Sequence, residues 1–143
     1  MGELRRIWTK RAHRGPMDER STATLIARRG IVGNADQGGK RQVTIVDEAR
    51  WNELMEQLGA DADPRERRAN LLVRGIDLMD TRGRLLRIGP AALRIVGETR
   101  PCERMDEVWP GLQEALRHRW GGGVFAEVIE GGDIAVGDLV RLE

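Results

Sequence analysis

The chain has 143 residues, of which 40% are hydrophobic and 33% are charged, a composition typical of a globular protein and not of a disordered one. The net charge of +1 removes any global electrostatic argument for a nucleic-acid partner. No apolar run approaches the roughly 18 residues of a membrane helix, and the amino terminus lacks a secretory signal, so no membrane partner is expected. A single cysteine excludes an internal disulfide. We therefore expect a single domain over residues 1–143 in a reducing cytoplasm.

Arginine greatly outnumbers lysine among the basic residues. Only Lys10 and Lys40 are lysines among the 24 basic residues, which leaves 22 arginines. Guanidinium groups suit bidentate recognition of phosphate or carboxylate, although a GC-rich genome produces the same bias. Aromatic residues make up only 3% of the chain, so a platform for stacking nucleobases is not expected.

The first half of the chain predicts strands around one helix. Apolar patterns predict short strands over residues 4–10, 22–27 and 42–46. Asp47 is a typical N-cap, and Gly59 is a typical helix terminator. Between them, an i, i+3, i+4, i+7 pattern predicts an amphipathic helix whose apolar positions are Trp51, Leu54, Met55 and Leu58. Residues 61–68 form a charged connector with room for one helical turn.

The second half is richer in predicted strands. These cover residues 71–73, 85–88 and 92–96. A second helix is predicted over 112–120, ended by three glycines. Residues 124–129 and 139–142 are predicted to close the chain as a hairpin-like pair. Many short strands, frequent glycines and only two good helices predict a mainly β protein, an antiparallel β-barrel with two short helices.

Common catalytic motifs are absent. There is no Gly-x-Gly-x-x-Gly, Walker loop, His-Glu-x-x-His or paired-cysteine zinc motif. The two histidines, His13 and His118, lie far from each other and from the cysteine in sequence. We interpret both as solvated residues, so a Cys–His or Ser–His dyad is poorly supported.

Cys102 is the strongest candidate for chemistry. It follows Arg100 and Pro101, just beyond a predicted strand, and precedes Glu103 and Arg104. Proline pushes the residue before it toward an extended backbone, which predicts a cysteine at the mouth of a loop leaving a strand. Neighbouring positive charge favours the thiolate, the form that attacks sulfur or binds metal. A buried, inert thiol is the alternative that the local sequence leaves open.

A second polar segment, Arg67-Arg68-Ala69-Asn70, stands directly before a predicted strand. In a barrel, the end of one strand and the start of another can face the same rim. Guanidinium groups and an amide beside a thiolate suit a ligand that carries phosphate together with a soft metal or a sulfur centre. An ordinary exposed charge run is the alternative for Arg67 and Arg68.

The order and spacing of several segments resemble the MOSC domain, named for the C-terminal part of molybdenum-cofactor sulfurases. The likeness extends from about residue 20 to residue 142. The segments that carry it are residues 30–33 (GIVG), 41–45 (RQVTI), 68–76 (RANLLVRGI), 86–93 (LRIGPAAL), 99–102 (TRPC) and 132–138 (GDIAVGD).

This resemblance implies a barrel of the MOSC and pyruvate-kinase type with a cysteine at its rim. In relatives, that cysteine is proposed to carry sulfur as a persulfide or to coordinate the molybdenum of a bound molybdopterin. Cys102 matches this catalytic or metal-binding position. Arg68, Asn70 and Arg100 match family positions that line the cofactor pocket.

The resemblance also implies partners. The chain is expected to be a stand-alone member, without the N-terminal barrel domain of amidoxime-reducing relatives. It has no pyridoxal-phosphate desulfurase domain, so a cysteine desulfurase-type donor or a molybdenum-cofactor enzyme is the expected partner. Relatives often have Gly-Asp followed by a histidine where this chain has Gly33-Asn34, which puts that loop's usual role in doubt.

Three functions follow from these observations and stay open at this point. The first is a sulfur carrier that uses a Cys102 persulfide, or a molybdenum-cofactor binder that uses the same thiol. The second is a molybdenum-cofactor-dependent oxidoreductase that reduces N-hydroxylated compounds. The third is a non-catalytic interaction module in which Cys102 is merely packed.

Overall fold

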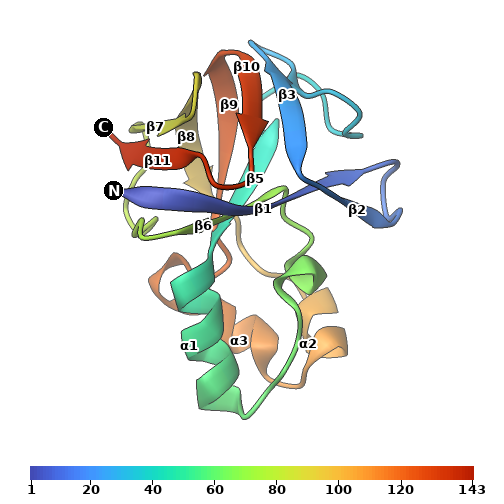
Figure 1. The fold of residues 1–143 in the computed structure, drawn as a ribbon. Helices are drawn as coiled ribbons and strands as arrows, with labels where there is room; N and C mark the ends of the chain where they lie inside the picture. Colours follow the sequence, from blue (N-terminus) through green and yellow to red (C-terminus); the bar gives the residue numbers. More distant parts are fainter.

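The computed structural model describes every residue from Met1 to Glu143, and its centre is a closed barrel of seven strands (Figure 1). Pairing of the last strand with the first closes the barrel. Neighbouring strands run antiparallel, except for one parallel pair, β5 and β6. In barrel order the strands are β11 (Leu139–Leu142), β7 (Leu85–Ile88), β8 (Ala91–Glu98), β9 (Val124–Glu130), β5 (Val43–Asp47), β6 (Leu71–Arg74) and β1 (Gly2–Lys10).

Two smaller groups of strands extend the barrel. A short strand, β2 (Met17–Arg20), pairs with the second half of β1 outside the ring. A separate three-stranded sheet covers the barrel end that lies at the top of Figure 1, and it consists of β10 (Gly132–Ala135), β3 (Thr22–Ile26) and β4 (Gly30–Ile31). Leu25, Ile31 and Ile134 from this sheet join the barrel's core of 20 buried residues. Their burial holds the small sheet against the barrel.

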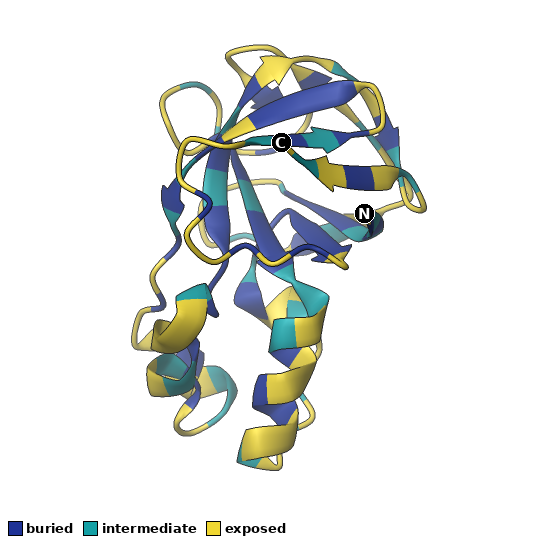
Figure 2. Cartoon of the chain, turned by 90° about the vertical axis from the view of Figure 1, so that its left-hand side faces the viewer, coloured by how far each residue is buried: buried dark blue, intermediate teal, exposed yellow.

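All helices gather at the other end of the barrel. They are α1 (Glu48–Leu58), the 3₁₀ turn η1 (Pro64–Arg67), α2 (Arg104–Val108), α3 (Leu112–Arg117) and the 3₁₀ turn η2 (His118–Trp120). This layer has its own apolar cluster, in which Trp51 and Leu54 of α1 meet Met105 of α2 and Leu112 of α3. Figure 2 shows that α1 is buried along one side and exposed along the other. No helix is long and apolar enough to cross a membrane.

The predicted fold class is confirmed, and so is the first helix. The Asp47 side chain accepts a hydrogen bond from the Ala49 backbone amide at 3.0 Å, which caps α1. Gly59 ends α1 with a left-handed φ of 62°. The single helical turn expected in residues 61–68 is η1.

The helices differ from the sequence prediction in two details. The structure has a third helix, α2, whose five residues are too few to show a helical period in the sequence. The predicted helix over 112–120 breaks after Arg117, because His118 has an extended backbone with ψ of 139°, and Arg119 and Trp120 then adopt a left-handed φ of 55°.

The predicted hairpin between residues 124–129 and 139–142 is wrong. β9 pairs with β5 and β8, β11 pairs with β7 and β1, and β10 lies between them in sequence and pairs with β3. Alternating apolar residues show that a segment is a strand but do not specify its partner. Partner choice here depends on barrel closure, a tertiary property.

Candidate functional site

Cys102 is exposed and lies between the end of β8 and the start of α2. Hydrogen bonds anchor the backbone on both sides of Cys102. The Thr99 amide donates to the Gly123 carbonyl at 2.8 Å, and the Met105 amide donates to the Cys102 carbonyl at 3.0 Å. The side chain of Met105 is buried in the helical layer. Cys102 is therefore an accessible thiol on an anchored loop and not a packed core residue.

A hollow of about 170 Å³ opens beside Cys102 at the helical end of the barrel. Its walls come from the end of β1, the start of β5 and the loop before it, η1 and the segment that leads from it into β6, the loop that carries Cys102, and α2. Five of the lining residues are basic and one, Asp36, is acidic. The basic residues are Lys10, Arg41, Arg67, Arg68 and Arg104.

Arg67 is the buried cation of this hollow, with only 8% of its surface exposed. Its Nε donates to the Gly122 carbonyl at 3.0 Å and its Nη2 donates to the Thr99 carbonyl at 3.1 Å. Its Nη1 has only a weak contact, 3.9 Å from the sulfur of Met105. No carboxylate lies within 4.0 Å, so the guanidinium is held by neutral groups alone.

The charge of Arg67 is consequently not neutralised by the protein. Burial lowers the pKa of Arg67 to about 10, while the charge of Cys102 opposes this shift and that of Arg41 adds to it. The guanidinium still carries its proton at neutral pH. A buried cation without an anionic partner is costly, and a thiolate or a bound anion in the hollow relieves that cost.

Three further arginines around the hollow also lack an acidic partner. Arg41 lies over the ring of Phe125, with its guanidinium carbon 5.0 Å from the ring centre. Arg68 donates from Nη2 to the Gly15 carbonyl at 2.6 Å, and Arg104 is exposed at the first position of α2. Only Lys10 is paired, with Asp36 at 3.0 Å. The hollow therefore has a positive potential that favours anions.

Asn70 lines the hollow, but its amide is occupied by protein contacts. Its Oδ1 accepts from the backbone amide and the hydroxyl of Thr44 at 3.0 and 3.2 Å. Its Nδ2 donates to the Trp8 carbonyl at 3.2 Å and to Oδ1 of Asn34 at 3.1 Å. With four contacts, Asn70 ties β1, β5 and the loop at Asn34 together.

Arg100 lies outside this hollow. Its side chain is 88% exposed and reaches Glu98 only at 3.9 Å. It lines a neighbouring open hollow with Pro101 and Arg117. Of the four residues selected from the sequence, the structure brings together Cys102, Arg68 and Asn70, and it separates Arg100 from them.

The sequence does not single out Arg67, Arg41 or Arg104 as site residues, although it places Arg67 in the polar segment before β6 and Arg104 beside Cys102. An arginine within a charged run usually reads as exposed, and nothing local marks Arg67 as different. Its burial arises because η1 turns it inward against the carbonyls of Thr99 and Gly122, which are remote in sequence. The left-handed Arg68, with φ of 63°, then redirects the chain into β6.

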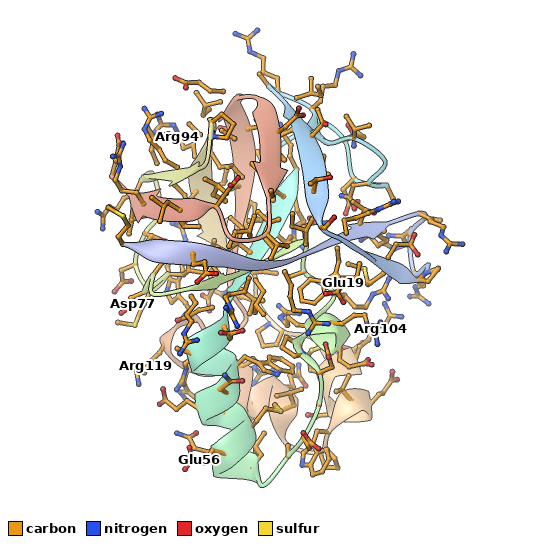
Figure 3. All side chains as sticks on the ribbon, viewed as in Figure 1. Glu19, Glu56, Asp77, Arg94, Arg104 and Arg119 are labelled. Atoms are coloured by element: carbon orange, nitrogen blue, oxygen red, sulfur yellow. The ribbon has the colours of Figure 1, made fainter.

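A second hollow, of about 270 Å³, lies at the start of α1 and contains no thiol. Asp47, Asp77, Arg119 and Trp120 are among its lining residues. Burial is the main cause that raises the pKa of Asp47, with a smaller contribution from the charge of Asp77. Figure 3 shows Asp77 and Arg119 on one side of the helical end and Arg104 on the other. Mixed charge and the absence of a nucleophile leave the Cys102 hollow as the candidate site.

Comparison with known proteins identifies the family and the fold of the chain. The model of the MOSC domain family matches residues 10–141. Among solved structures, the YuaD protein from Bacillus subtilis superposes with a TM-score of 0.81 at 20% identity, covering 99% of this chain and 96% of that one. YiiM from Geobacillus stearothermophilus superposes with a TM-score of 0.78 at 14% identity, covering 100% of this chain and 75% of that one.

YiiM from Escherichia coli is similar as well, with a TM-score of 0.69 at 13% identity over 99% of this chain and 69% of that one. At such identities, these likenesses concern the fold alone. No curated protein matches the sequence. The family model, by contrast, covers most of the chain, so this protein belongs to the MOSC domain family.

Proposed function

We propose that this protein is a sulfur carrier in which Cys102 accepts a sulfur atom as a persulfide and passes it on. The observation that carries the proposal is the pairing of an accessible thiol with the buried, carboxylate-free guanidinium of Arg67 in one hollow. A thiolate is both the nucleophile that takes up sulfur and the group that leaves when sulfur is handed on. The fixed positive charge of Arg67 attracts the negatively charged sulfur species of both steps.

The transfer step needs no oxidant. The Cys102 thiolate attacks the terminal sulfur of a donor persulfide, R–S–SH. A bond forms between the Cys102 sulfur and that terminal sulfur, the donor S–S bond breaks, and R–S⁻ leaves with the electron pair. Cys102–S–SH is formed with the transferred proton. In the onward step, an acceptor nucleophile takes the terminal sulfur and Cys102 leaves as the thiolate.

A cysteine desulfurase-type protein is the donor class that fits this step, because such enzymes present sulfur as a cysteine persulfide. Nothing in the transfer requires pyridoxal phosphate in this chain. The reaction takes place at exposed atoms, so the two proteins have only to bring their sulfur atoms into contact. We place this exchange in the cytoplasm, where a free thiol is stable.

The residues of the hollow also fit the molybdenum cofactor. The structure has no group of three or more His, Cys, Asp or Glu side chains that would hold a bare metal ion. The cofactor brings most of its own metal ligands, and from this chain it requires a soft ligand and cations for its phosphate. Cys102 would be that ligand, and Arg67 and Arg68 would face the anionic part. The bound cofactor would supply oxygen-atom or sulfur chemistry.

The volume of the Cys102 hollow favours a sulfur carrier over a protein that encloses the molybdenum cofactor. Pockets that enclose a drug-sized ligand measure roughly 300–1,000 Å³. The Cys102 hollow measures about 170 Å³ and would leave much of a pterin in solvent. It is large enough for a persulfide or for a single anionic group.

Intact-mass spectrometry tests the proposal. The protein is incubated with a cysteine desulfurase and cysteine, and its mass is compared before and after reduction. We expect a gain of one sulfur atom that dithiothreitol removes and that Cys102→Ala lacks, while the circular dichroism spectrum of the variant stays unchanged. Sulfur that remains on Cys102→Ala, or none on the native protein, would overturn it.

The same spectra separate the alternatives. An adduct of cofactor mass on protein from a host that makes molybdenum cofactor would favour the oxidoreductase of N-hydroxylated compounds. If neither a sulfur adduct nor a cofactor adduct forms, the non-catalytic interaction module is the function that remains. Because Cys102 is exposed, its substitution is not expected to unfold the protein.

A further inference from the structure

We propose that Cys102 exchanges sulfur with a cysteine that sits in an acidic segment of a partner protein, and that this segment docks on a basic rim around Cys102. The basic rim is defined as Arg41, Arg65, Arg68, Arg100 and Arg104. This inference rests on the proposed carrier function, and it names the class of partner. Its test is independent of whether Cys102 holds a persulfide.

The first argument is the extent of the basic rim. Arginines of the rim line three hollows. Arg68 lines both the Cys102 hollow and a second one, of about 280 Å³, that also includes Arg65. The third, of about 490 Å³, is lined by Arg100 and by Pro101, which directly precedes Cys102. A single phosphate fills only one of these hollows, whereas an extended segment reaches all three.

The second argument is charge. The three hollows are lined by eight basic residues and three acidic ones, although the whole chain has a net charge of only +1. Arg41, Arg65, Arg68 and Arg104 have no carboxylate within 4.0 Å, and Arg100 has one only at 3.9 Å. Glu103, next to Cys102 in sequence, lines none of the hollows.

Several arginines elsewhere are already paired with carboxylates. Arg6 donates to Glu19 at 2.8 Å, and Arg11 and Arg87 reach their carboxylates at 2.7 and 2.6 Å. Those guanidinium groups are already paired within the chain. The arginines of the basic rim have no carboxylate at hydrogen-bond distance, although Arg68 donates to the Gly15 carbonyl, and a guanidinium without an anionic partner binds carboxylates in bidentate fashion.

The third argument is access. Cys102 is exposed at the mouth of its hollow, so a partner cysteine can approach its sulfur without entering the protein. Arg104 and Arg100 lie two residues to either side of it in sequence. Charges at the edge of an interface mainly accelerate encounter, by about 10- to 1,000-fold where fields are strong. The basic rim would therefore select donors and acceptors by the charge around their cysteine.

Thiol–disulfide exchange with charged peptides tests this directly. Three cysteine peptides of equal length, flanked by glutamates, by serines or by lysines, are each activated as the mixed disulfide with thionitrobenzoate. The Cys102 thiolate attacks the peptide sulfur, the coloured aromatic thiolate leaves with the electron pair, and a Cys102–peptide disulfide forms. At low ionic strength we expect the acidic peptide to react at least about tenfold faster than the basic one.

High salt and two charge-reversal variants test whether charge causes this preference. The preference should disappear near 1 M salt, where the screening length falls to about 3 Å. Arg104→Glu should reduce it several-fold. Arg94→Glu makes the same change in charge at the far end of the barrel, where Figure 3 shows Arg94, and it should leave the preference intact. The serine peptide reports intrinsic thiol reactivity in each variant, so the acidic-to-serine rate ratio is independent of partial unfolding.

Equal rates for the acidic and basic peptides would overturn the proposal. So would a preference that inorganic phosphate abolishes while chloride of equal ionic strength does not, because that would assign the hollow to a small anion. A charge preference in a protein that holds no persulfide would support the docking surface and overturn only the carrier function.

Discussion

The guanidinium of Arg67 donates from Nη2 to the carbonyl oxygen of Thr99 at 3.1 Å, which links η1 to the loop that carries Cys102. Thr99 precedes Cys102 by three residues. Nε of Arg67 holds the Gly122 carbonyl at the same time, at 3.0 Å. One buried cation thus fixes two chain segments and sets the charge of the hollow. Arg67 therefore contributes both to the stability of the fold and to the charge beside Cys102.

Replacing Arg67 should therefore affect both properties. Arg67→Met removes the donors of two buried carbonyls, and we expect the free energy of unfolding to fall by roughly 1–3 kcal/mol. The rate of Cys102 alkylation by anionic iodoacetate, relative to that by neutral iodoacetamide, should fall roughly two- to tenfold, because the hollow loses a positive charge that attracts anions. Urea denaturation and alkylation kinetics measure the two effects. Arg67→Lys, which keeps the charge, should restore most of the relative rate; an unchanged relative rate in Arg67→Met would contradict the role given to this charge.

Gly122 should tolerate no side chain. A Cβ added there would overlap the Thr99 carbonyl oxygen and lie 2.9 Å from Nη2 of Arg67. Since backbone cannot yield as a flexible side chain does, Gly122→Ala should destabilise the fold by roughly 1–3 kcal/mol and displace Arg67. Thermal unfolding followed by circular dichroism measures the change. Gly121→Ala is the comparison variant in the same glycine run. Its Cβ would lie 3.0 Å from the Leu116 carbonyl oxygen, a looser contact than at Gly122, so it should cost less stability.

Asn70 and Arg100 should behave in opposite ways. Asn70→Ala leaves buried partners in Thr44 and Trp8 without their hydrogen bonds, so we expect a loss of roughly 2 kcal/mol or more in unfolding free energy. Arg100→Ala removes an exposed side chain and should stay within about 0.5 kcal/mol of the native protein. Chemical denaturation of both variants measures this contrast. A stable Asn70→Ala would show that the polar connections among β1, β5 and β6 do not matter for folding.

The ion pair of Arg6 and Glu19 should make stability depend on pH. Hydrogen bonds from Arg6, at 3.0 and 2.8 Å, are the main cause that lowers the pKa of Glu19 below its usual 4.5. Its stabilisation is present above the pKa of the unfolded chain and is lost as pH falls through the lower, folded value. Since Glu19 is nearly half exposed, the effect should be at most about 1 kcal/mol.

Glu19→Gln provides the measurement for that pair. The native protein should be the more stable of the two near neutral pH, and the difference in unfolding free energy should shrink as pH falls below the usual glutamate pKa of 4.5. A difference that stays constant with pH would mean that Glu19 acts through packing and not through its charge.

Much of the fold was predictable from local patterns. Asp47 and Gly59 mark the ends of α1 because capping depends on neighbouring atoms only. Apolar patterns located all seven barrel strands for the same reason. By contrast, α2 is too short for periodicity, and the pairing of β9 and β11 depends on barrel closure. Strand pairing of this kind depends on residues far apart in sequence, so no local sequence pattern predicts it.

In the candidate site, too, the local features were predictable from the sequence and the long-range contacts were not. The sequence by itself determined that the one thiol follows Arg100 and Pro101 beyond a strand, since proline geometry is local. Only the tertiary structure decided which arginines face that thiol. It turned Arg67 inward, through carbonyls supplied by segments more than thirty residues away, and left Arg100 in solvent. Burial and charge pairing depend on atoms that are distant in sequence, and folding alone brings those atoms together.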